Sequence, residues 1–395
     1  MLRTSRLGLT AALLAAGANP AAWAQDSSPL TYNASYSTQT DSNLFRLPSS
    51  STLNTSERVA TSTVGVGFDT TQSLQRFEFD ASLVDYKYQN FNYLSFTARN
   101  YAAAWHWALT PKLTGNLTSS LKETLNSFVD TVGLNSRNQR TDTQQRFDAD
   151  FALDGPWHVV AGISQARQSN QQALVADGDY STASADLGVR HAFASGSSIA
   201  YAAKVSNGSY FNRVVPSAGL FDDSFKQLDN DLRLHWSLGG SSTADANITH
   251  INRTHGNYGQ RDFNGFNTGA RFLWVLTGKS AIGAGYSSDL GAYATSNTNY
   301  TQTDRINVGP VWQMSPKITL RLNHTWAQIA YLGSPTPGLR SDRRDTTRDT
   351  ALSLNWQPYR QLGLSTTVQS ASRGSNIANL DYDSQQLSFS AQFNY

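Results

Sequence analysis

The chain has 395 residues, no cysteine, and 31 basic against 29 acidic residues. The lack of cysteine excludes disulfides, a thiol nucleophile and thiolate metal sites, and a net charge of +2 argues against a strongly basic nucleic-acid-binding protein. Hydrophobic residues make up 39% of the chain, and beyond the N-terminal segment no window is apolar enough to predict a membrane-spanning helix.

The first 24 residues have the pattern of a secretory signal peptide. Arg3 and Arg6 precede an apolar run from Leu7 to Ala18, and Ala22-Trp23-Ala24 supplies an Ala-x-Ala cleavage box. We therefore predict a signal peptide at residues 1–24 and a mature domain at residues 25–395. An N-terminal membrane anchor is disfavoured, because the run is shorter than the ~20 apolar residues that a spanning helix needs.

Most of the mature chain alternates apolar and polar residues, as strands do when one face meets hydrocarbon and the other meets water. The clearest stretches are Phe147–Leu153, Ala183–Phe193, Lys226–Leu238 and the closing Gln386–Tyr395. The first strand, Thr31–Gln39, alternates only loosely and has the alternative of entering the lumen as part of a plug. If it is a strand, it should pair with the closing strand across the barrel seam.

Short turn motifs recur about every 40 residues. Each contains Gly, Pro, Asp or Ser, which favour tight turns, and the motifs begin at Phe68, Leu109, Leu153, Phe193, Leu238, Leu276, Met314 and Trp356. A propeller blade has a similar period, but a strand of about a dozen residues is too long for one. Longer polar connections alternate with the turns; they include Asp41–Arg58, Leu125–Asp142 and Ala294–Thr301.

These features predict an all-β transmembrane antiparallel barrel of about 18 strands, with 16 as the alternative count. The turns would be periplasmic and the long loops extracellular, in a bacterial outer membrane. Aromatic residues two positions before a turn or the chain end predict a girdle at the membrane–water interface, at Trp107, Phe151, Trp236, Trp274, Trp312 and Phe393. Phe393 and the terminal Tyr395 also fit an assembly signal read by the barrel-assembly machinery.

Charged residues on the polar face should point into the lumen, because basic charge on the lipid face costs ~2–4 kcal/mol at mid-bilayer. They are Arg76, Glu78, Asp80, Arg146, Asp148, Asp150, Asp186, Arg190, Lys204, Asp231, Arg233, Asp245, Arg271, Arg305, Arg321 and Asp349. Two interpretations remain open, a wet channel whose charges set selectivity and a packed interior of mutually paired charges. The candidate plugs are the loops Asp41–Arg58 and Leu125–Asp142, since a barrel of ~16–18 strands is otherwise an aqueous channel.

No catalytic, cofactor or metal site is predicted, and we do not expect an enzyme. The sequence lacks a Gly-x-Ser-x-Gly elbow, a phosphate-binding glycine loop and a His-Glu-x-x-His zinc helix. Its seven histidines are scattered over different predicted strands and both faces. We interpret the Asp222–Asp223 pair, and Asp381 with Asp383, as solvated loop charge rather than calcium ligands.

Five motifs occur in order along the mature chain: Asp41-Ser-Asn-Leu-Phe-Arg46, the stretch Asp85–Tyr101, Arg146-Phe-Asp-Ala-Asp150, Gln260-Arg-Asp-Phe263 and Asp381-Tyr-Asp-Ser384. Together they resemble the EpsL family, outer-membrane proteins of exopolysaccharide biosynthesis operons that often accompany PEP-CTERM/exosortase systems. The resemblance implies a bacterial outer-membrane barrel that works with polysaccharide synthesis and export, and it supplies no catalytic residues.

The leading hypothesis is an outer-membrane porin-like channel through which a secreted exopolysaccharide passes passively. One alternative is a general diffusion porin, and another is a structural barrel whose outer loops bind polysaccharide at the cell surface. A barrel enzyme acting on glycan or lipid is the last alternative, and no motif argues for it. The expected partners are outer-membrane lipid, exopolysaccharide, the barrel-assembly machinery and periplasmic polysaccharide export proteins, with no nucleic acid.

Overall fold

The computed structural model describes residues 28–126, 128–129, 136–172, 179–211, 222–239, 241–257, 259–295, 298–333 and 342–395. The predicted signal peptide at residues 1–24 lies outside the described residues, as does part of the loop Leu125–Asp142. Besides strands, the described residues contain two single 3-10 turns, η1 (Asn92–Leu94) and η2 (Gly259–Arg261). No helix within the described ranges is long and apolar enough to cross a membrane.

Eighteen strands account for nearly all of the regular structure. They are β1 (Leu30–Asp41), β2 (Glu57–Gln72), β3 (Gln75–Tyr88), β4 (Phe96–Thr110), β5 (Leu113–Leu125), β6 (Gln139–Ala152), β7 (Trp157–Asn170), β8 (Tyr180–Ala192), β9 (Ser198–Tyr210), β10 (Ser224–Leu238), β11 (Ser242–His255), β12 (Phe263–Thr277), β13 (Ser280–Thr295), β14 (Thr298–Ser315), β15 (Ile318–Leu332), β16 (Arg344–Trp356), β17 (Leu362–Ser375) and β18 (Tyr382–Asn394).

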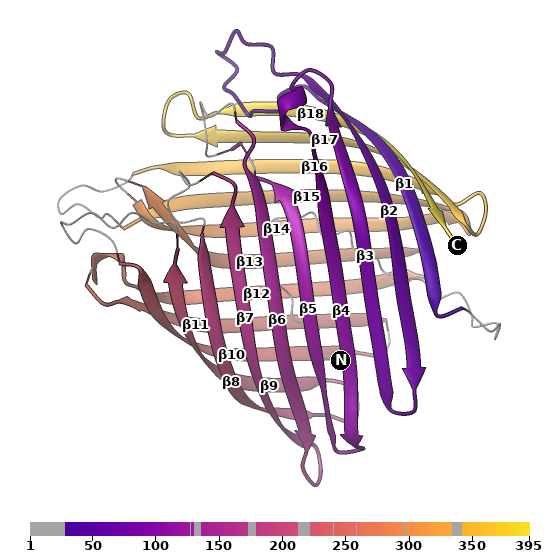
Figure 1. The fold of residues 1–395 in the computed structure, drawn as a ribbon, viewed down its shortest axis with the longest axis vertical. Coiled ribbons are helices and arrows are strands. Elements are labelled where there is room, and N and C mark those ends of the chain that lie inside the picture. Colours follow the sequence, from indigo (N-terminus) through magenta and orange to yellow (C-terminus); the bar gives the residue numbers. More distant parts are fainter. Residues whose placement is uncertain are drawn as a thin grey trace.

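Each strand pairs antiparallel with its neighbours in the chain, and the sheet closes on itself because β1 pairs with both β2 and β18. At the seam Ala34 lies opposite Phe393, and the backbones of Tyr32 and Tyr395 exchange hydrogen bonds of 2.7 and 2.8 Å. Figure 1 shows the result as a barrel whose front strands cross the rear strands steeply. The predicted fold is therefore confirmed, and the alternative in which the first strand forms a plug is wrong.

The outer face carries an apolar band. Leu187, Ile163 and Val64 are 63%, 61% and 57% exposed, and their chain neighbours on either side point to the inner face. Side chains of this kind are stable on a surface only where hydrocarbon covers them. The band therefore indicates the part of the barrel that lies in lipid.

Two expected boundaries are wrong. β2 continues through the turn expected at Phe68, and the chain reverses at Ser73, whose φ of 58° is left-handed. The β-forming threonines Thr70 and Thr71 extend the strand. The loop expected at Ala294–Thr301 is much shorter, because β13 and β14 extend as a hairpin to Thr295 and Thr298.

The predicted girdle residues all point outward beside the short turns. Phe151, Trp236, Trp274, Trp312 and Phe393 are 41–49% exposed. Trp107 differs, with 6% exposure, because its ring covers Gly115 on β5 and stacks on Phe147 at 5.5 Å. That this set marks a membrane interface stays a prediction.

Candidate functional site

The inner face of the barrel carries the charged residues that the sequence assigns to a lumen. The strand register shows this for Asp186 on β8, whose cross-strand partners are Gly162 on β7 and Lys204 on β9. The next residue, Leu187, points outward. The same face holds Arg76, Glu78 and Asp80 on β3, Arg146, Asp148 and Asp150 on β6, Arg190 on β8, Lys204 on β9, Asp231 and Arg233 on β10, Asp245 on β11, Arg271 on β12, Arg305 on β14, Arg321 on β15 and Asp349 on β16. That they line a conducting channel stays a prediction.

A chain of polar contacts follows this wall from β2 to β6. The Arg76 guanidinium contacts Asp69 at 2.6 Å and Glu78 at 2.7 Å. His106 lies 3.5 Å from Glu78 and hydrogen-bonds Asn116, whose amide donates to Asp148 at 2.8 Å. Side chains tied in this way lie along the wall rather than across the lumen.

Arg146 extends the chain of contacts across a whole strand. Its guanidinium starts on β6, passes over Gly162 on β7 and binds both carboxylate oxygens of Asp186 on β8, at 2.7 and 2.9 Å. A Cβ at position 162 would lie 2.4 Å from the Arg146 Nη2 atom. The missing side chain at Gly162 thus leaves room for the arginine to lie flat against the wall, and an alanine there would push the guanidinium aside.

Further ion pairs lie along the neighbouring strands. The Asp150 carboxylate contacts both Arg190 and His158, the latter at 2.6 Å. Lys204 on β9 pairs with the buried Asp229 on β10 at 2.8 Å. Both signs of charge are thus spread around the wall, which does not favour a strongly anion-selective or cation-selective surface.

Near the short turns of β10 to β12 the inner wall is open to solvent. Arg233 and Asp245 each keep 51% of their side-chain surface exposed, and His235 keeps 45%. Arg271, opposite Asp245, is also exposed and makes no ion pair within the described ranges. Charges this exposed on the inside of a closed sheet require water around them.

The loop between β1 and β2, residues 42–56, folds over the mouth of the barrel. The Arg46 guanidinium bonds to the buried Asp41 at 2.9 and 3.1 Å, and Asp41 also accepts from Ser384 and Gln386 on β18. The Phe45 ring packs edge-on against Phe91 at 4.7 Å. The loop is thus held to the seam strands by a charge cluster and to the loop after β3 by aromatic contact.

Glu57 fixes the next loop. Its buried carboxylate accepts hydrogen bonds from the backbone N–H groups of Gln89, Asn90 and Phe91 at 3.0, 2.9 and 2.7 Å. Partial burial, and secondly the negative charge of Glu57, raise the pKa of Tyr93 above its ordinary value. The loop after β3 therefore presents a neutral tyrosine near the mouth.

The second candidate plug loop meets the first. Phe128, between β5 and β6, packs against Phe45 at 4.9 Å between ring centroids. The carbonyl of Val129 accepts a hydrogen bond of 3.1 Å from Arg373 on β17. The described part of this loop therefore crosses the mouth toward strands that are far from β5 around the barrel, and both loops narrow the entrance.

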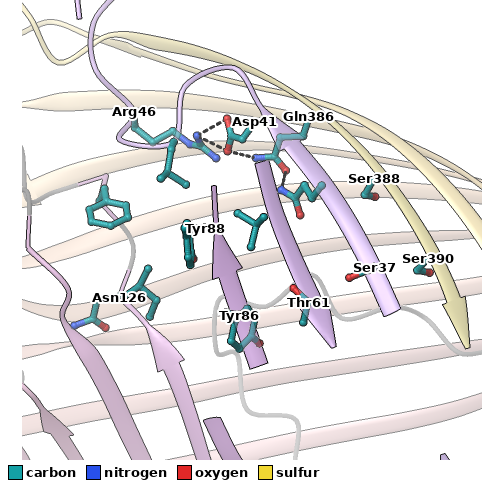
Figure 2. A pocket seen from close by; sticks show the side chains of 15 residues that line it. Ser37, Asp41, Arg46, Thr61, Tyr86, Tyr88, Asn126, Gln386, Ser388 and Ser390 are labelled. Atoms are coloured by element: carbon teal, nitrogen blue, oxygen red, sulfur yellow. Dashed lines mark hydrogen bonds and ion pairs between the residues drawn. The ribbon is translucent and has the colours of Figure 1, made fainter. Parts of the chain in front are cut away.

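A cavity of about 430 Å³ lies beneath these loops, against β1, β2, β3 and β18. Figure 2 shows Arg46 and Asp41 joined at one end, with Tyr86 and Tyr88 on the wall below. The remaining lining is mostly hydroxyl and amide, from Ser37, Gln39, Thr61, Asn126, Gln386, Ser388 and Ser390. Because Arg46 neutralises Asp41, the cavity offers neutral hydrogen-bonding groups and aromatic rings.

Sequence reasoning missed several functional candidates. Trp157 and Trp356 lie outward beside the short turns at 49% and 47% exposure, and Trp105 at 38%. A search for tryptophan on any outward position near a turn would have found them. The aromatic contacts of Phe45 had no sequence signal. Among the described residues, no group of three or more metal-binding side chains is found.

No protein-family model matches the sequence, and no curated protein matches it. Solved structures match its fold. The outer membrane protein OpdK from Pseudomonas aeruginosa superposes with a TM-score of 0.52 at 13% identity, over 93% of this chain and 99% of that chain. A BenF-like porin from Pseudomonas fluorescens Pf-5 gives 0.53 at 13% identity, with the same coverage of 93% and 99%. OpdO from Pseudomonas aeruginosa gives 0.52 at 12% identity, over 92% and 96%. This chain therefore has the barrel fold of those outer-membrane proteins.

Proposed function

We propose that the protein is a porin-like channel of a bacterial outer membrane that takes part in exopolysaccharide export. The observation that carries the channel is the solvent exposure of inward charges, with Arg233 and Asp245 at 51% inside a closed barrel. A packed interior would bury such groups against partners. An 18-stranded barrel is wide enough to hold water instead.

Passage would be passive. A hydrated polymer exchanges water for wall hydroxyls, amides and charges as it moves, so no energy-coupling residue is needed. The paired charges, such as Arg146 with Asp186, keep the wall wet without binding one charge sign tightly. The apolar band and the signal peptide predicted at residues 1–24 support the outer-membrane location.

Two observations support a polysaccharide as the passenger. One is the resemblance of the motifs at Asp41–Arg46 and Asp381–Ser384 to the EpsL family. The other is the mouth cavity, whose hydroxyls and amides suit sugar hydroxyls and whose Tyr86 ring suits a sugar face. Periplasmic export proteins would dock at the short turns.

A general diffusion porin is the second candidate, favoured by the fold likeness to porins. One of the matching structures is OpdK from Pseudomonas aeruginosa with vanillate, at a TM-score of 0.52 and 12% identity. A small solute of that kind would need no polymer-specific contacts. Both candidates share an open lumen and differ only in what the mouth selects.

Planar-bilayer recording separates the candidates. The purified barrel is inserted into a bilayer in KCl, and single-channel current is followed while a neutral polysaccharide, dextran, and its monomer, glucose, are added in turn. Current that dextran interrupts and glucose does not supports the export channel. Current unaffected by dextran, together with glucose uptake in liposome swelling, supports the general porin. No current at all contradicts both.

A separate experiment on cells tests the remaining alternative, a structural barrel that binds polysaccharide at the cell surface. Intact cells with and without the protein are compared for bound and secreted polysaccharide. Lower secretion without the protein supports export. Unchanged secretion with reduced surface-bound glycan supports a barrel that only retains polysaccharide at the surface.

A further inference from the structure

Charged residues on the outer face are confined to one end of the barrel. Along the described strands, every outward-facing charge lies near the long loops, and the apolar band and the girdle beside the short turns contain none. The basic ones are Arg58, Lys87, Arg99, Arg167, Lys226, Arg344 and Arg348, and the acidic ones are Asp85, Glu123, Asp304 and Asp383. All seven basic side chains are exposed.

Three of the four acidic members already have protein partners. Asp85 pairs with Lys87 at 3.5 Å, Glu123 accepts the backbone N–H of Arg99 at 2.7 Å, and Asp304 accepts the Tyr286 hydroxyl at 3.4 Å. By contrast, the side chains of Arg99, Lys226, Arg344 and Arg348 form no ion pair or hydrogen bond with other described residues. The outer face at this end therefore presents unneutralised positive charge.

These cations lie directly beside the lipid-facing surface. Arg348 lies on the same face of β16 as Leu352 and Leu354, which are 46% and 43% exposed, and opposite Trp326 on β15. Arg99 lies opposite the outward Leu83, which is 50% exposed. A partner that covers both the cations and the adjacent apolar side chains must itself be amphipathic.

We propose that this ring of outward arginines and lysines binds the phosphate groups of an anionic lipid in the leaflet around the long loops. Along the membrane normal, the headgroup phosphate of a lipid lies next to its hydrocarbon chain. Arg348 and Leu352 follow each other in the same way on the outer face of β16, with Arg348 nearer the long loops. The planar guanidinium binds phosphate oxygens in pairs, which explains why arginine predominates. The inference rests on the membrane location argued under the proposed function, but not on what passes through the lumen.

The test uses the folded full-length mature protein in zwitterionic detergent and native mass spectrometry. The probes are bis-phosphorylated lipid A and the same lipid with both phosphates removed. The test variant is Arg99→Gln/Arg344→Gln/Arg348→Gln. The matched control is Lys279→Gln/Lys317→Gln/Arg360→Gln, which removes three cations from the short turns at the opposite end. A heat-modifiable gel shift verifies that each barrel is folded.

We expect wild type and control to bind the phosphorylated lipid alike. The test variant should bind it more weakly, by about 25-fold where Arg344 and Arg348 on β16 meet one headgroup and by about fivefold at Arg99 on β4, at about fivefold for each charge removed. The dephosphorylated lipid should bind weakly to all three. Equal affinity of wild type and test variant, or equal affinity for the two lipids, would overturn the proposal. Competition by millimolar inorganic phosphate would overturn the assignment to a lipid headgroup. A wild-type barrel that binds the phosphorylated lipid but conducts no current would support this site and contradict the channel.

Discussion

The Arg146 guanidinium binds both oxygens of the Asp186 carboxylate, although a complete strand lies between β6 and β8. The pair is only partly exposed, at 20% and 12% of the two side chains. Partly buried, bidentate pairs of this kind are stronger than single surface contacts. The contact thus braces three strands on the inner wall and keeps a long cationic side chain out of the lumen.

Gly162→Ala should destabilise the barrel by about 0.5–1 kcal/mol, because the new Cβ displaces only the flexible end of Arg146 and the loss is that of a partly exposed ion pair. The new Cβ would lie 2.4 Å from Arg146 Nη2 and push the guanidinium off Asp186. Urea unfolding of the refolded barrel in detergent measures the effect. Gly363→Ala is the matched control, because a Cβ there meets nothing within 4 Å. Equal stability of the two variants would contradict the bracing role of Arg146.

Arg271→Glu should shift ion selectivity toward cations at a cost of less than about 1 kcal/mol in stability, because the new carboxylate lies opposite Asp245 on β11. Arg271 is exposed on the inner wall and makes no ion pair among the described residues, so its replacement breaks no contact. The measurement is the reversal potential in a KCl gradient, with Arg360→Glu in a short turn as the control. An unchanged reversal potential would mean that permeating ions do not pass Arg271.

The fold was predictable because side-chain alternation and turn chemistry are local. Lys226–Leu238 shows its outward face in the sequence itself, and the two residues that break its alternation, Lys226 and Asn230, do lie outward. Asn230 is tolerated because it accepts a 2.7 Å hydrogen bond from the Tyr201 hydroxyl, and Lys226 because it lies at the end near the long loops. An outward polar residue such as Asn230 depends on a side chain of the neighbouring strand, and the alternation within a single strand cannot identify that neighbour.

For the charged residues of the inner wall, only the inward orientation of the side chains was predictable from the sequence. The polar face identifies Arg146 and Asp186 separately, but their pairing depends on the register of three strands and on Gly162 between them. The meeting of Phe45 with Phe128 likewise depends on loop conformations that have no periodicity to read. The first turn was misplaced because Asp69 and its neighbouring threonines suit either a turn or a strand.

Deletion of residues 393–395 should reduce folded barrel in the outer membrane to less than about a tenth of the wild-type level. The truncation removes the paired backbone hydrogen bonds between Tyr395 and Tyr32 and the residue opposite Ala34, and leaves the first residues of β1 without a partner on β18. Immunoblotting of outer-membrane fractions provides the readout. Tyr395→Phe, which keeps the backbone bonds and the terminal aromatic, should assemble normally. Wild-type levels of the truncated chain would contradict the assembly role of the closing strand.

Removal of residues 45–54 should enlarge the entrance. The N–H of Leu44 donates to the carbonyl of Thr55 at 3.0 Å, so a two-glycine link can join the cut ends without strain on β1 or β2. The deletion removes Arg46 and Phe45 from the mouth and should raise single-channel conductance. A matched deletion control replaces residues 376–379, between β17 and β18, with the same link. Equal conductance of both deletions would show that the loop between β1 and β2 does not narrow the path.

Single-channel conductance of the wild-type barrel in a planar bilayer tests the central claim most directly. Exposed inward charges such as Arg233 and Asp245 predict a water-filled lumen and therefore discrete current steps in KCl. A correctly folded barrel that inserts yet passes no current, even after residues 45–54 are removed, would contradict the account.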